Sequence, residues 1–118
     1  MIDREIKVIG FIGLGVMGCS MSKNLLKNKN WNVLVKDLNA NKEKELENQG
    51  AKIASDTREI FTLSDLVITC LPGGDFVRDL YYGKDKYISD IKINQFIIDM
   101  STSQPDLMIK LENEIKIK

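Results

Sequence analysis

The sequence contains no histidine, and it has only two cysteines and two prolines in 118 residues. Without histidine, acid–base or metal chemistry through an imidazole is excluded. Cys19 and Cys70 lie in apolar runs without a paired spacing, which favours reduced packing residues over a disulfide or a metal site. We therefore expect an intracellular protein that holds no metal.

Net charge is also lacking, because 17 lysine and arginine residues balance 17 aspartate and glutamate residues. The chain therefore offers no basic field for nucleic acid or an anionic membrane, and any anion must be held locally. The first five residues do not have the charged-then-apolar order of a signal peptide, and no apolar run is long enough to cross a bilayer. We expect one cytoplasmic domain over residues 1–118.

Apolar runs alternate with longer segments of helical spacing, which is typical of strands joined by crossover helices. Most of the runs are apolar throughout, as expected for strands that helices cover on both faces. This pattern predicts an α/β fold, a Rossmann-type doubly wound parallel sheet of at least five strands in the order 3-2-1-4-5. The expected strands are residues 7–13, 32–36, 52–54, 66–71 and 95–99.

Helices are expected between these strands. The first carries Met17, Met21 and Leu25 on one face, with lysines pointing away. A second helix is expected over residues 40–49, and a short third helix begins after a cap at residue 56. A fourth ends at Gly83, and a last helix begins at a capping box over residues 103–106. The polar stretch 83–94 is expected to be a linker.

Four glycines fall within the nine residues "GFIGLGVMG", directly behind an apolar run. Within this stretch, Gly13, Gly15 and Gly18 have the GxGxxG spacing of a dinucleotide-binding turn. The first glycine permits the tight strand-to-helix turn, the second lets a pyrophosphate approach the main chain, and the third lets the helix pack on the strand. Main-chain N–H groups at the start of the helix would hold the phosphates. The alternative is an ordinary structural turn.

The context of the motif favours the nucleotide interpretation. Asp37 ends the second expected strand, 19 residues after Gly18, where an acidic side chain binds the adenosine ribose. A carboxylate repels the additional 2′-phosphate of NADP, and Leu38 stands where an arginine could clamp it. Both features predict NAD more than NADP as the cofactor, although Lys36 and Lys42 are near enough to weaken the preference.

Three stretches resemble the β-hydroxyacid dehydrogenases, which include 3-hydroxyisobutyrate dehydrogenase and relatives of 6-phosphogluconate dehydrogenase. "GFIGLGVMGCSMSKNLLK" is similar to the opening fingerprint of this family. "CLPGGDFVRDLYYG" is similar to the segment after its fourth strand, and "DMSTSQPD" to its substrate-binding motif. The three stretches occur in the family's order and cover most of the chain.

The resemblance implies roles for individual residues. Leu14, Gly15, Val16 and Met17 would line the pyrophosphate and nicotinamide side, Leu71 and Pro72 would border the cofactor, and Val77 would lie near the adenine. Ser101 and Thr102 would bind the substrate carboxylate, for which hydroxyl groups at a helix N-terminus are suitable partners. The alternative for this pair is that they only cap the last helix.

The family's catalytic lysine and its helical second domain have no counterpart in these 118 residues. We therefore expect an N-terminal NAD(P)-binding domain of an oxidoreductase that acts on a small 3-hydroxy acid, with no catalytic residue and no activity in this chain alone. A stand-alone dinucleotide-binding module is the alternative. Three further hypotheses fit the motif: a flavin protein, a short-chain reductase that uses Tyr82 and Lys86, and a purely structural domain.

Overall fold

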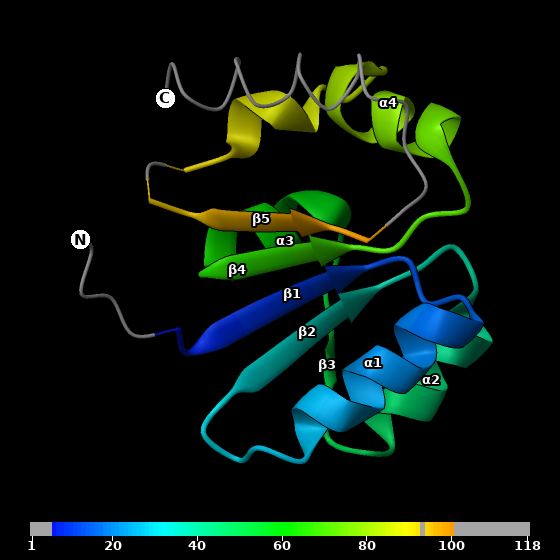
Figure 1. Ribbon diagram of the computed structural model, residues 1–118, viewed down its shortest axis with the longest axis vertical. Coiled ribbons are helices and arrows are strands. Elements are labelled where there is room, and N and C mark those ends of the chain that lie inside the picture. Colours follow the sequence, from blue (N-terminus) through cyan, green and yellow to red (C-terminus); the bar gives the residue numbers. More distant parts are fainter. Residues whose placement is uncertain (1–5, 93, 101–118) are drawn as a thin grey trace.

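The computed structural model describes residues 6–92 and 94–100, and it contains a five-stranded parallel sheet (Figure 1). The strand order β3-β2-β1-β4-β5 confirms the predicted order. Every strand lies within a run predicted from the sequence, with bounds that differ by one or two residues. The strands are β1 Val8–Ile12, β2 Asn32–Lys36, β3 Lys52–Ile53, β4 Leu66–Thr69 and β5 Phe96–Asp99.

Helices lie on both faces of the sheet, as a doubly wound fold requires (Figure 1). On one face, α1 (Val16–Leu26) and α2 (Ala40–Glu47) pack together, and Leu46 of α2 is fully buried. On the other face lie α3 (Thr57–Leu63), α4 (Gly74–Tyr82) and the short 3₁₀ helix η1 (Tyr87–Asp90). The helix expected from residue 103 onward lies outside the described residues.

Two apolar cores, one on each side of the sheet, follow from this layering. The inner strands β1, β2 and β4 are buried along most of their length, as their uninterrupted apolar runs predict. β5 differs, because Phe96 and Ile98 are about two-fifths exposed on one side. As the edge strand of the described sheet, β5 has a second face that the described helices leave partly open.

The prediction that residues 83–94 form a linker is wrong, because part of this segment packs on the core. Ile88 and Ile91 are buried beside α3 and α4. The Tyr87 ring stacks on Phe61 with ring centroids 5.9 Å apart, and Arg58 Nε lies 3.2 Å from an Asp90 carboxylate oxygen. The two isoleucines three residues apart were the available signal, but the surrounding charges obscured it.

Parallel pairing brings the carboxyl ends of four strands to one edge of the sheet. Ile12 pairs with both Lys36 and Thr69, and Thr69 pairs with Asp99. The glycine turn, Asp37 and the loop after β4 therefore converge, although they are far apart in sequence. This edge is where open α/β sheets bind ligands.

Among the helices that the structure describes, none has the length and apolar character that a membrane span requires.

Candidate functional site

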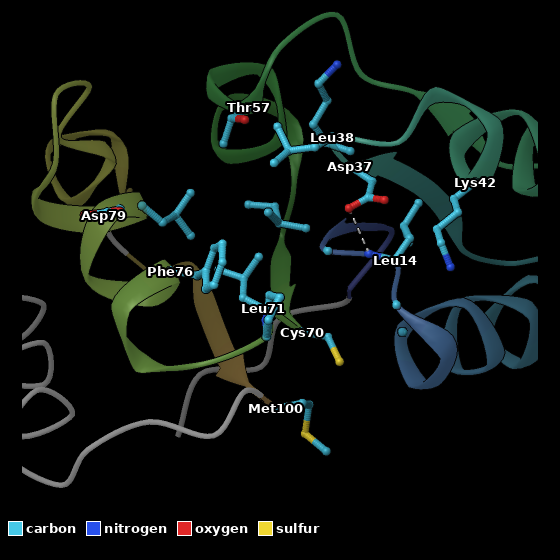
Figure 2. A pocket seen from close by; sticks show the side chains of 17 residues that line it. Leu14, Asp37, Leu38, Lys42, Thr57, Cys70, Leu71, Phe76, Asp79 and Met100 are labelled. Atoms are coloured by element: carbon cyan, nitrogen blue, oxygen red, sulfur yellow. Dashed lines mark hydrogen bonds between the residues drawn. The ribbon is translucent and has the colours of Figure 1, made fainter.

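A cleft of about 630 Å³ opens at the carboxyl edge of the sheet (Figure 2). Its volume lies within the range of small-molecule and cofactor sites. The turn after β1, the end of β2, the start of α3, the loop after β4 and helix α4 contribute its walls. Seven of the residues that the sequence analysis predicts to bind the cofactor are in the lining: Gly13, Leu14, Gly15, Gly18, Asp37, Leu71 and Pro72.

Gly13 makes the sharp turn out of β1. Its φ of +94° is a conformation that L side chains rarely adopt, and a Cβ at this position would collide with the carbonyl oxygen of Cys70. Its N–H donates to the carbonyl of Lys36 over 3.0 Å. Glycine is therefore required at position 13, where the main chain bonds to the end of β2 and passes close to the end of β4.

Gly18 and Gly15 have different reasons to be glycine. A Cβ at Gly18 would lie 2.5 Å from the carbonyl oxygen of Gly13 and 3.3 Å from the Phe11 ring, so helix α1 can rest on the turn only without a side chain there. A Cβ at Gly15 would meet no atom of the described residues within 4 Å. The protein's own packing does not require glycine at position 15, which faces the cleft at the N-terminus of α1.

The N-terminus of α1 is suited to an anion. The helix begins after Gly15, which has no side chain to cap it, and no acidic residue lies in the first turn. The first N–H groups of an α-helix have no intrahelical partner, and the helix dipole is positive at this end. Open space above such donors is what a pyrophosphate group requires.

Asp37 lies beside this turn at the end of β2, and its side chain is half-buried. Oδ1 accepts a hydrogen bond from the N–H of Leu14, and Oδ2 accepts one from the N–H of Asn39, each over 3.4 Å. Both exceed the usual N–H···O distance of about 2.9 Å. Figure 2 shows the carboxylate directed toward the glycine turn. Its oxygens keep acceptor capacity for the hydroxyl groups of a ribose.

A second carboxylate, Glu43 of α2, lies behind Asp37 and was not singled out from the sequence. Its side chain is 8% exposed, and Oε2 accepts a hydrogen bond from the N–H of Asp37 over 3.0 Å. The same oxygen lies 3.5 Å from Nζ of Lys36. In a strongly charged helix this glutamate was indistinguishable from a solvent-facing residue, so the sequence gave no signal for its burial.

The opposite wall is apolar and comes from the loop after β4 and from α4. Cys70, Leu71, Pro72 and Phe76 line it, and Met100 lies at its lower end in Figure 2. Burial, with a smaller effect of Asp99, raises the pKa of the Cys70 thiol. The thiol is therefore protonated near neutral pH, and it acts as an apolar part of the wall.

Among the residues predicted to bind the cofactor whose side chains the structure describes, Val77 does not line the cleft. It is fully buried in the core beside α3, whereas its neighbour Phe76 is half exposed and lines the cleft. Successive residues on a helix point about 100° apart, so a shift of one position along α4 exchanges a wall residue for a core residue. In the structure Phe76, and not Val77, lines this wall.

The remaining predicted residues lie outside the described side chains or away from the cleft. α1 begins at Val16, but the side chains of Val16 and Met17 are not described, and Ser101 and Thr102 lie outside the described residues. Tyr82 ends α4, Lys86 follows it in a loop, and neither lines the cleft. Within the part of the chain that the structure describes, no group of three or more metal-ligating side chains gathers.

Known proteins share this sequence pattern. The model of the NAD-binding domain of 6-phosphogluconate dehydrogenase matches residues 8–118. A probable mitochondrial 3-hydroxyisobutyrate dehydrogenase of Dictyostelium discoideum is 34% identical over 84% of the chain and 30% of its own length. The 3-sulfolactaldehyde reductase of Escherichia coli K12 is 34% identical over 93% of the chain and 37% of its own length.

Solved structures share the fold. The 3-hydroxyisobutyrate dehydrogenase of Mycobacterium tuberculosis, solved with L-serine, superposes with a TM-score of 0.79 at 26% identity, over 93% of this chain and 38% of that one. Psf3 in complex with NADP+ and 2-OPP gives a TM-score of 0.85 at 27% identity, over 92% of this chain and 38% of that one. The chain thus spans between 30% and 38% of the length of these four proteins.

The match of the family model to almost the whole chain agrees with the strand order, the glycine turn and the acidic residue at the end of β2. The chain belongs to the family of NAD-binding domains of 6-phosphogluconate dehydrogenase, and its relatives include 3-hydroxyisobutyrate dehydrogenases.

Proposed function

We propose that the cleft binds NAD, with the pyrophosphate over Gly15 and the adenosine ribose on Asp37. The open space at Gly15 is the observation that carries this proposal, because no contact within the described part of the chain requires glycine there. The N-terminus of α1 supplies donors and a positive dipole end for the phosphates. Asp37 supplies acceptors for the ribose hydroxyl groups at the neighbouring strand end.

The side chains at the two ends of the cleft suggest where the adenine and the nicotinamide of the cofactor lie. We place the adenine between Leu38, which is 99% exposed, and Phe76, since exposed apolar side chains on both sides of a cleft suit a flat aromatic ring. The nicotinamide then lies toward Leu71, Pro72 and Met100. Leu71 and Pro72 would shield one side of the ring from water.

The preference for NAD over NADP is part of this proposal. Asp37 would repel a 2′-phosphate, and Leu38 offers it no hydrogen bond. We expect NADH to bind at least tenfold more tightly than NADPH, as measured by titration of cofactor fluorescence. Leu38→Arg should narrow that difference by improving NADPH binding, because a guanidinium pairs with a phosphate through two hydrogen bonds. Tighter binding of NADPH by the unaltered chain would contradict the preference.

We further propose that residues 1–118 form one dinucleotide-binding domain of a longer dehydrogenase. Its relatives are about three times as long as the matched segment, which leaves room for a second domain. In such a protein the nicotinamide exchanges a hydride with a small 3-hydroxy acid, and Ser101 and Thr102 bind the acid's carboxylate. The residues of this chain position the cofactor.

This division of labour predicts binding without turnover. The 118-residue chain should bind NADH weakly, because it holds mainly the adenosine half while a second domain would close the nicotinamide side, and it should not reduce NAD with 3-hydroxyisobutyrate. Absorbance at 340 nm measures the second property, and binding is measured on the same sample. Turnover by the purified chain would show that the catalytic groups lie within it.

A further inference from the structure

Glu43 is the most deeply buried acidic side chain near the cleft, and the binding scheme above does not use it. Its side chain is 8% exposed, although an unpaired carboxylate would strongly resist this burial. Two contacts offset the cost, because Oε2 accepts from the N–H of Asp37 over 3.0 Å and lies 3.5 Å from Lys36 Nζ. Glu43 therefore touches both residues at the end of β2.

Lys36 is the cation that this contact affects. It lines the cleft beside Asp37, close to the position that a 2′-phosphate would occupy on the ribose. An ammonium group there could pair with that phosphate. In the structure the group is directed to Glu43, and its side chain is only 29% exposed, so a phosphate would have to compete with a carboxylate already in place.

The other charges around this corner do not replace Lys36. Lys42 also lines the cleft, but it comes from the first turn of α2 and not from the end of β2. Its charge acts on Glu45, whose pKa is lowered mainly by Lys23 at 2.8 Å and to a smaller degree by Lys42. Asp37 and Glu43 give the corner two carboxylates. Their combined potential opposes a doubly charged phosphate, whereas a neutral ribose hydroxyl can donate a hydrogen bond to a carboxylate.

We propose that Glu43 is a residue that determines cofactor specificity, by engaging Lys36 and placing a second negative charge behind Asp37. This inference rests on the proposed function, because it concerns the ribose corner of the same cleft. It assigns the rejection of the 2′-phosphate to a pair of carboxylates, of which only Asp37 would touch the ribose.

The test is Glu43→Gln, with NADH and NADPH titrated separately. Glutamine keeps an oxygen that can accept from the N–H of Asp37, but it removes the charge that holds Lys36. We expect NADPH affinity to rise at least fivefold and NADH affinity to stay within twofold. Glu47→Gln is the matched control, since Glu47 is on the same helix and pairs with Lys44 over 2.8 Å at the surface. It should change neither affinity.

Lys36 supplies a second, independent variant. In the unaltered chain, Lys36→Gln should leave NADPH affinity within twofold, because the ammonium is already engaged. Combined with Glu43→Gln, the same change should remove the gain in NADPH affinity. A loss of tenfold or more in NADPH affinity from Lys36→Gln alone would overturn the inference, even where Glu43→Gln fails to fold.

The outcomes separate this inference from the proposed function. If the unaltered chain binds neither NADH nor NADPH, both are wrong. If it binds NADH more tightly than NADPH, and Glu43→Gln changes the two affinities equally or not at all, the proposed function stands and the role of Glu43 is wrong. A gain confined to NADPH, and lost with Lys36→Gln, supports the role.

Discussion

Replacing Gly15 with leucine is expected to abolish measurable NADH binding while the protein remains folded. A Cβ at this position meets none of the residues that the structure describes within 4 Å, and the backbone at φ −61° and ψ −174° is open to any L residue. The leucine side chain would therefore occupy the space above the start of α1 where we place the pyrophosphate. We expect a loss of about 100-fold or more, roughly 2.7 kcal/mol of binding free energy, in fluorescence titrations with NADH.

Gly73→Leu is the matched control for this variant. Gly73 precedes α4 as Gly15 precedes α1, and a Cβ there also meets nothing within 4 Å, but Gly73 is not among the residues that line the cleft. We expect NADH affinity within threefold of the unaltered chain. Thermal unfolding of both variants should match that of the unaltered chain within a few degrees. Unchanged affinity in Gly15→Leu would show that the phosphates bind elsewhere.

The three glycines of the motif illustrate how much of the site the sequence could specify. Their separate tasks were predicted from spacing alone, and the neighbours of Gly13 and Gly18 in the structure agree with the tasks assigned to them. This succeeds because a strand, a tight turn and a helix in immediate succession are local geometry. The strand order could also be predicted, since right-handed crossovers leave few arrangements for alternating strands and helices.

The parts that the sequence could not supply depend on contacts between distant segments. The burial of Glu43 depends on how α2 lies against the end of β2, and nothing in a charged helix signals which charge faces inward. Phe76 and Val77 are adjacent apolar residues, and only the rotation of α4 against the sheet decides which one enters the core. Ile88 is likewise buried through α3 and α4, which precede it in the chain.

The same reasoning indicates where stability and binding can be separated in this turn. The protein's own packing requires glycine at positions 13 and 18, since any other residue there would place its Cβ against main-chain atoms. At position 15, by contrast, we propose that glycine keeps space in the cleft open for the pyrophosphate. Substitutions at these positions should therefore affect different measurements, although the residues lie within six positions of one another.

Gly13→Ala is accordingly expected to lower the free energy of unfolding substantially. Alanine at φ +94° is strained by about 1–3 kcal/mol. Its Cβ would also press on the Cys70 carbonyl, which cannot withdraw easily because the N–H of Cys70 bonds to Ile12 over 2.9 Å. We expect a total loss of about 3 kcal/mol or more in urea unfolding followed by circular dichroism. Gly15→Ala is the control and should cost less than about 0.5 kcal/mol. Equal losses in the two variants would mean that the turn tolerates a side chain at position 13, and that the close approach of Gly13 to the Cys70 carbonyl does not require glycine there.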